Sequence, residues 1–141
     1  MSTPTTLDLR NLPEAERDDR INEAVHEIAT GKQGPFHWVY MHVEEINDIG
    51  EDVGHYWWHD GTGAKYEEFP RYATSADAVL PLLEKFVAEG SRSVGWSANQ
   101  SIAHIVTLYY GMAECARGQA QTFPLAACIA LLRAHGIKVL L

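Results

Sequence analysis

The chain has 141 residues, of which 46% are hydrophobic, and its formal net charge is −8. This length and hydrophobic content predict one packed domain over residues 1–141 and exclude a disordered chain. Because an acidic chain repels phosphate groups at long range, we expect no direct nucleic-acid binding.

The first predicted helix begins close to Pro13, because proline suits the first turn of a helix. Ile21, Val25 and Ile28 follow at helical spacing, and Gly31 is expected to end the helix. Residues 1–11 are polar and are predicted to form a loosely held N-terminal arm.

Two strands are predicted in the aromatic stretch that follows. Phe36–Val43 is aromatic and β-branched, and His55–His59 is flanked by glycines and runs into a turn dipeptide. The acidic stretch between them, Glu44–Gly54, is interpreted as a loop.

A middle helix is predicted from a cap at Thr74 or Ser75 to about Ala88. Pro81 lies inside this segment, and proline lacks the N–H that would bond to the carbonyl of Asp77. We therefore expect this helix either to kink or to begin late, at Pro81.

Two strands and a last helix are predicted after the middle helix. Ser91–Ser97 and Ile102–Tyr110 have strand composition, whereas Gly111–Gln121 is a connection of uncertain form. Thr122 caps a helix that ends at Gly136, and the apolar tail Ile137–Leu141 is expected to pack back on the body.

The last helix carries four residues that share one helical stripe: Leu125, Cys128, Ile129 and Leu132. This stripe is predicted to be buried against the sheet.

Two segments of the chain, Phe69–Phe86 and Thr122–Gly136, resemble the phage ABA (α-β-α) sandwich family of small phage and prophage proteins. The matching positions are Tyr72, Thr74, Ala78, Leu82, Leu83, Glu84 and Lys85 in the first segment, and Pro124, Leu125, Ala126, Cys128 and the run Ala130–Ala134 in the second. Leu80 stands where the family has a tryptophan, and Pro81 also departs from the pattern. The resemblance implies an α+β fold in which a small, mainly antiparallel sheet is packed between helices, as an α-β-α sandwich.

No residue pattern in the sequence favours catalysis or a metal. In a strand, His55 and His59 would lie about 13 Å apart, too far to share one zinc ion. Cys115 lies close to the cationic Arg117, which could lower the pKa of its thiol, but no strand–elbow–helix signature surrounds it. We therefore expect no enzyme, no metal and no cofactor.

The acidic stretch and the tryptophan pair beside it form the candidate partner-binding surface. Acidic side chains would steer a basic partner, and one tryptophan of the pair would face outward as an anchor. The residues of this candidate surface are Glu44, Glu45, Asp48, Glu51, Asp52, Trp57 and Trp58.

These observations predict a small phage or prophage accessory protein that binds a host or phage protein, including a target in a host defence system. The lack of an apolar run of about 18 residues and of a signal peptide, with only two cysteines, predicts a cytoplasmic protein of the bacterial host. One alternative is a small-molecule-binding protein or enzyme that uses the aromatic and histidine patch His55–Asp60. Another is a self-associating structural protein, such as a homodimer.

Overall fold

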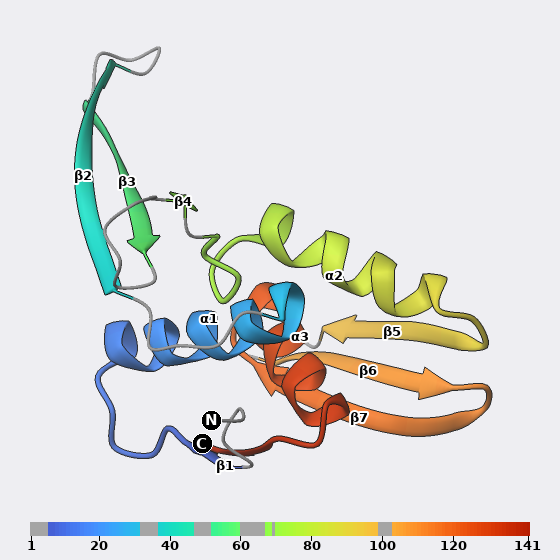
Figure 1. Ribbon diagram of the computed structural model, residues 1–141. Helices are drawn as coiled ribbons and strands as arrows, with labels where there is room; N and C mark the ends of the chain where they lie inside the picture. Colours follow the sequence, from blue (N-terminus) through green and yellow to red (C-terminus); the bar gives the residue numbers. More distant parts are fainter. Residues whose placement is uncertain (1–5, 32–36, 47–51, 60–66, 69, 99–102) are drawn as a thin grey trace. The chain divides into compact units, whose positions relative to one another are not determined.

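The computed structural model describes residues 6–31, 37–46, 52–59, 67–68, 70–98 and 103–141 (Figure 1). In 37–46, 52–59 and 67–68 the backbone alone is described. The chain divides into two compact units: unit 1 is Met1–Lys32 with Arg71–Leu141, and unit 2 is Gln33–Pro70.

Unit 1 has an α+β fold in which a mainly antiparallel sheet packs against helices, as predicted. The antiparallel sheet has the strand order β5-β6-β7, and a parallel pair joins β1 to β8. The elements are β1 (Thr6–Asp8), α1 (Glu14–Thr30), α2 (Ala76–Ala88), β5 (Arg92–Ala98), β6 (His104–Tyr110), β7 (Ala113–Ala120), α3 (Phe123–Ala134) and β8 (Lys138–Leu140).

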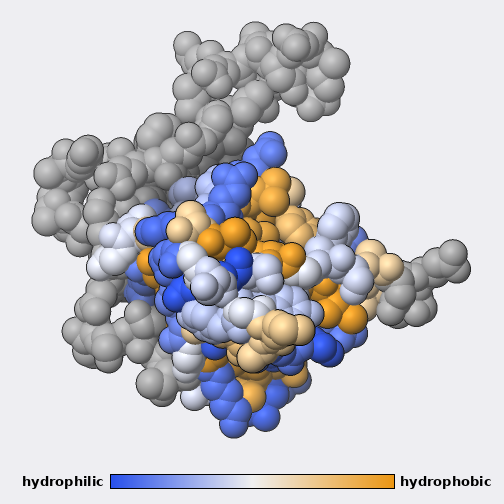
Figure 2. All heavy atoms as spheres, turned by 90° about the vertical axis from the view of Figure 1, so that its right-hand side faces the viewer, coloured by the Kyte–Doolittle hydropathy of each residue, from blue (hydrophilic) through white to orange (hydrophobic). Residues whose placement is uncertain are grey.

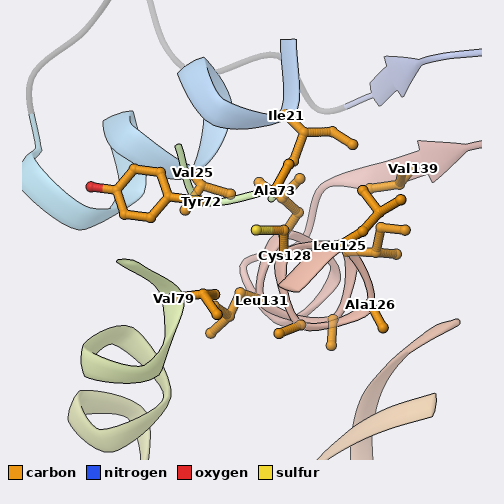
Figure 3. Close-up of a cluster of buried hydrophobic side chains, with 14 of the residues drawn as sticks. Ile21, Val25, Tyr72, Ala73, Val79, Leu125, Ala126, Cys128, Leu131 and Val139 are labelled. Carbon is orange, nitrogen blue, oxygen red and sulfur yellow. The ribbon is translucent and has the colours of Figure 1, made fainter. Parts of the chain in front are cut away.

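Helix α3 lies at the centre of unit 1. It packs on β6 and β7 and also contacts α1 and α2. Ile21 and Val25 of α1 and Val79 of α2 point toward it (Figure 3). The predicted buried stripe is confirmed, and burial extends over every residue from 125 to 132 because neighbours surround the helix.

The close approach of α3 to the sheet requires a glycine at position 118. A Cβ atom built on Gly118 would lie 2.1 Å from the carbonyl oxygen of Ala126 and 2.6 Å from the amide nitrogen of Ala130. These contacts are with backbone atoms, which cannot rotate away. Gly118 is in register with Val106 and Trp96, so these residues share the face of the sheet that α2 and α3 contact.

The predicted helix boundaries are confirmed at both outer helices and at the start of α2. Gly31, at φ 73°, ends α1 in the left-handed conformation that favours glycine. Ser75 caps α2, and its hydroxyl accepts a hydrogen bond from the amide of Ala78 at 3.3 Å. The helix runs from Ala76 through Pro81, so the predicted late start at Pro81 is wrong. The Ser75 cap gives the first turn a bonding partner before the proline is reached.

Both ends of the described chain contribute to one parallel strand pair. Leu7 pairs with Val139, and Leu7 and Leu9 are both buried. The expectation of a loosely held arm is therefore wrong for Thr6–Leu9, because leucine side chains hold this segment on the body. The predicted packing of the apolar tail is confirmed by the burial of Ile137 and Val139.

The segment of uncertain form, Gly111–Gln121, contains strand β7. Its alanines and glycine have low β propensity, so the composition of the segment does not indicate a strand. Tertiary packing against α3 requires the glycine at position 118.

Unit 2 is an antiparallel sheet of β2 (His37–Ile46), β3 (Asp52–His59) and β4 (Glu67–Glu68). Both predicted strands are confirmed. The loop interpretation of Glu44–Gly54 is wrong at its two ends, because Glu44 and Glu45 lie in β2 and Asp52–Gly54 in β3. The register shifts between His42 and Ile46, so the acidic pair falls at an irregularity of the ladder.

We predict that Gly118→Ala lowers the free energy of unfolding by about 2 kcal/mol or more, because the added methyl group overpacks the contact with α3. Gly95→Ala is the matched control. Its Cβ would meet Cε2 of Tyr109 at 3.2 Å, which is a side-chain atom and not a backbone atom. Denaturant unfolding measures both variants, and equal losses would contradict the close-approach account.

Candidate functional site

The structure places the sequence-predicted binding residues in unit 2. Glu44 and Glu45 lie in β2, and Asp52, Trp57 and Trp58 lie in β3. Asp48 and Glu51 lie outside the described residues, as does Asp60 of the histidine patch. The backbone register sets Trp58 beside Trp38 and Trp57 beside Val39.

A second surface that the sequence analysis missed lies in unit 1. Helix α2 and strand β5 enclose a largely hydrophobic groove of 440 Å³, which we name the α2–β5 groove. Its residues are Leu80, Leu83, Glu84, Val87, Ala88, Val94, Trp96 and Phe123. On the side of unit 1 where α2 turns into β5, hydrophobic residues reach the surface among hydrophilic ones (Figure 2).

Three large hydrophobic side chains of the groove are exposed to solvent. Trp96 is 59% exposed, and Leu80 and Val87 are each 42% exposed. Single exposed apolar residues are normal, whereas these three lie together on one groove.

The Trp96 ring is held in place by two neighbouring rings. Its plane lies within 6° of the plane of the His104 ring, with ring centroids 5.9 Å apart, and its centroid lies 5.1 Å from that of the Phe123 ring. Its indole Nε1–H donates a hydrogen bond to Nδ1 of His104 at 3.1 Å. A ring fixed in this way loses little side-chain entropy when a partner covers it.

The spacing of apolar residues along α2 indicates this groove in the sequence. Val79, Leu83 and Phe86 form the buried stripe of the helix, and Leu80 and Val87 lie seven residues apart on a second stripe. One apolar stripe is sufficient to bury a surface helix, so the second stripe indicates a further contact.

The two edges of the unit 1 sheet differ in their protection. The edge strand β7 carries the ion pair Arg117–Glu114, at 2.6 Å, and its register with β6 shifts between Leu108 and Tyr109. The other edge strand, β5, has no charged residue from Ser93 to Ala98 and pairs with β6 without a shift. Charges and bulges protect sheet edges against pairing with another chain, and among the described residues β5 is the edge that lacks both.

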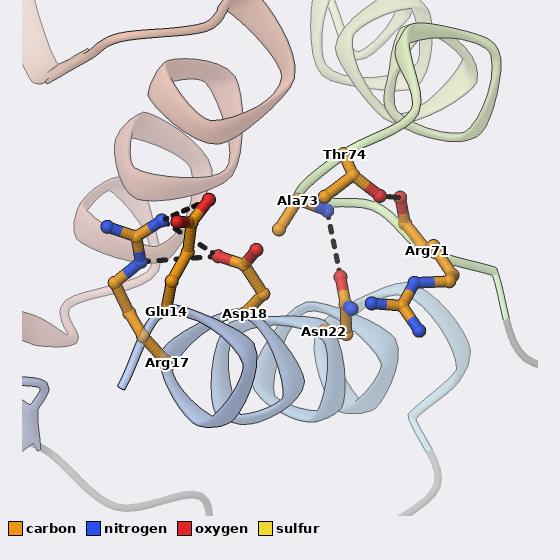
Figure 4. A network of polar contacts seen from close by, with 7 residues as sticks. All are labelled: Glu14, Arg17, Asp18, Asn22, Arg71, Ala73 and Thr74. Carbon is orange, nitrogen blue, oxygen red and sulfur yellow. Dashed lines mark hydrogen bonds and ion pairs between the residues drawn. The ribbon is translucent and has the colours of Figure 1, made fainter. Parts of the chain in front are cut away.

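A buried polar cluster on α1 has a structural role. Asp18, Asn22 and His26 are buried at four-residue spacing. Oδ1 of Asn22 accepts a hydrogen bond from the amide of Ala73 at 2.8 Å, and it points at the segment before α2 (Figure 4). This bond satisfies a buried backbone donor and holds the segment on α1.

The thiol nearest to this cluster is not suited to nucleophilic chemistry. Burial raises the pKa of the Cys128 thiol, and the negative charge of Asp18 raises it further. A thiol with a raised pKa and no exposed surface stays protonated and inert. Cys115, in β7, is half-buried.

Two kinds of feature, a metal-binding group and a membrane-spanning helix, are absent from the described part of the chain. No group of three or more His, Cys, Asp and Glu residues is placed there to hold a metal ion. No helix in those same residues has the length and apolarity needed to cross a membrane.

Comparisons with known proteins identify no relative of this chain. No family model, no curated protein and no solved structure matches the chain significantly.

We predict that a thiol reagent such as DTNB modifies one cysteine of the native protein, Cys115, and reaches Cys128 only after unfolding in denaturant. The reason is the burial of Cys128, which hides the sulfur and keeps it protonated. Cys115→Ser is the control. A fast reaction of the native Cys115→Ser variant would show that Cys128 is accessible and would contradict its assignment as a buried, inert thiol.

Proposed function

We propose that the protein acts by binding another protein, and that the α2–β5 groove is its contact surface. The observation that carries the proposal is Trp96, a fixed and 59% exposed ring beside two other exposed apolar side chains. Tryptophan is enriched among the residues that dominate binding energy. Truncation of such an anchor costs about 2 kcal/mol or more.

The chemistry of the groove supports a partner segment that is apolar and carries one basic residue. Among the described residues that line the groove, Glu84 is the single charged one, and it is exposed. An apolar segment would bury Leu80 and Val87, and a lysine or arginine would meet the Glu84 carboxylate. An extended segment would in addition pair its backbone with the β5 edge.

We propose, in line with the resemblance to the phage ABA sandwich family, that the protein is a phage or prophage accessory protein. Its partner would then be a host or phage protein in the bacterial cytoplasm, including a component of a host defence system. The acidic and tryptophan-bearing segment of unit 2 stays a second proposed contact, with Glu44, Glu45, Asp48, Glu51 and Asp52 beside Trp57 and Trp58. The alternative of a small-molecule site at His55–Asp60 also stays a prediction.

We predict that Trp96→Ala weakens partner binding by about thirtyfold, the equivalent of 2 kcal/mol. The partner is first captured from host cells, identified by mass spectrometry and purified. Calorimetry then compares the wild type with Trp96→Ala and with Met112→Ala, a control at a fully exposed hydrophobic residue outside the groove. If Trp57→Ala or Trp58→Ala abolishes binding and Trp96→Ala does not, the contact surface lies in unit 2.

A second candidate function, self-association, is favoured by strand β5, which has no charged residue from Ser93 to Ala98. Pairing of β5 with its copy around a two-fold axis at Gly95 would set Val94 against Trp96 and Arg92 against Ala98, with no like charges opposed. Sedimentation equilibrium separates the two functions. Each copy carries −8, so self-association should strengthen as salt increases, whereas binding of a basic partner should weaken. A monomer at every protein and salt concentration would eliminate self-association.

A further inference from the structure

Helices α1 and α2 enclose a second hollow in unit 1, on the other side of α2 from the groove. Both helices pack on α3 and have little direct contact with each other. The space between them is a cavity of 210 Å³, which we name the three-helix cavity. It shares no lining residue with the α2–β5 groove.

The inner wall of the three-helix cavity is apolar. Val25 of α1, Phe86 of α2 and Leu131 of α3 are each buried and line it together. Ile28 and Leu82, which are half-buried, extend this wall toward the opening. An apolar wall of this kind binds the hydrocarbon part of a ligand and leaves orientation to polar groups.

Two of the four polar residues of the cavity are cationic. Lys85 and Arg92 line it with a single acid, Glu89, and with His135. Arg92 forms an ion pair with Glu89, whereas the exposed Lys85 has no ion pair among the described residues. The lining thus carries an excess positive charge in a chain whose net charge is −8.

The Arg92 guanidinium is held in position before any ligand binds. It lies 4.9 Å from the centroid of the Phe86 ring and 4.5 Å from that of Tyr110. Stacking and the ion pair with Glu89 fix its direction, and a guanidinium has donors beyond those that one carboxylate uses.

His135 supplies a further polar group at the same cavity. Its Nδ1 lies 2.9 Å from the carbonyl oxygen of Leu131. A carbonyl only accepts hydrogen bonds, so Nδ1 carries the proton and Nε2 is left for another partner.

We propose that the three-helix cavity binds a small amphipathic organic anion, with its apolar body on Val25, Phe86 and Leu131 and its carboxylate at Lys85 and Arg92. The size of the cavity agrees with this class of ligand. An apolar cavity of about 150 Å³ in another protein holds benzene, so 210 Å³ accommodates a ring with a short acidic arm. The cationic lining selects the anion over a neutral or cationic molecule of the same shape. This site is independent of the proposed protein-binding surface.

The probe that tests the proposal is hydrocinnamate, a phenyl ring with a short carboxylate arm, compared with its amide and with the corresponding amine. Methyl-resolved NMR titration of the full chain gives the affinity and the location. We expect hydrocinnamate to bind with a dissociation constant of about 1 mM or below. The shifts should be confined to the methyl groups of Val25, Ile28, Leu82 and Leu131, and the amide and the amine should bind more weakly.

Two variants and one control complete the test. Ala29→Phe places a ring in the cavity from α1 and should abolish binding. Lys85→Gln should weaken hydrocinnamate by about threefold and leave the amide unchanged, whereas Lys138→Gln, an exposed lysine on β8, should change neither.

Three results would overturn the proposal. The first is that hydrocinnamate at about 10 mM, ten times the expected dissociation constant, causes no shifts in these methyl groups. The others are that the amine binds as tightly as hydrocinnamate, or that the Ala29→Phe variant still binds hydrocinnamate. If Ala29→Phe does not fold, the methyl shifts and the comparison of the three probes on the wild-type chain decide the question. None of these results bears on binding at Trp96.

Discussion

The contact between α3 and the sheet at Gly118 is the constraint on which unit 1 depends. Helix α3 is buried along eight consecutive residues, 125–132, so it needs neighbours on every side. The sheet is able to cover one side of α3 because position 118 is a glycine. The backbone of Ala126 and Ala130 can then approach β7 without a Cβ atom between them. Helices α1 and α2 and the parallel pair β1–β8 cover what remains. Loss of this approach would remove the surface on which the other elements pack.

The same arrangement creates both candidate sites. Helices α1 and α2 both pack on α3 and have little direct contact with each other, so two sides of α2 stay uncovered by a helix. Leu80 and Val87 line the α2–β5 groove on one side, while Lys85 and Glu89 line the three-helix cavity on the other. The chemistry of the two sides differs: the groove is apolar with the acidic Glu84, and the cavity joins an apolar wall to cations. A partner protein and a small anion are therefore expected at different places on one helix.

Residues that act locally could be predicted from the sequence, and residues that act through tertiary packing could not. Ser75 and Gly31 set helix ends by bonding or by backbone conformation within one turn, so their roles are visible in the sequence. Strand β7 could not be predicted from composition, because Gly118 serves the contact with α3 and has a low strand propensity. Trp96 was missed for a similar reason. The density of acids and aromatics drew attention to Trp57 and Trp58, whereas the exposure of Trp96 depends on where α2 and Phe123 lie.

The most direct test of the proposed binding surface is site-specific photocrosslinking in cells of the proposed bacterial host. The protein would carry a photoreactive amino acid in place of Val87, in the α2–β5 groove, and in separate variants in place of Met112 or Trp57. We predict one dominant crosslinked partner from position 87, with the same partner weak or absent from position 112, which is fully exposed but outside the groove. The crosslink from position 87 should disappear when Trp96→Ala is added. A partner that crosslinks from position 57 and not from position 87 would contradict the account and place the binding surface in unit 2.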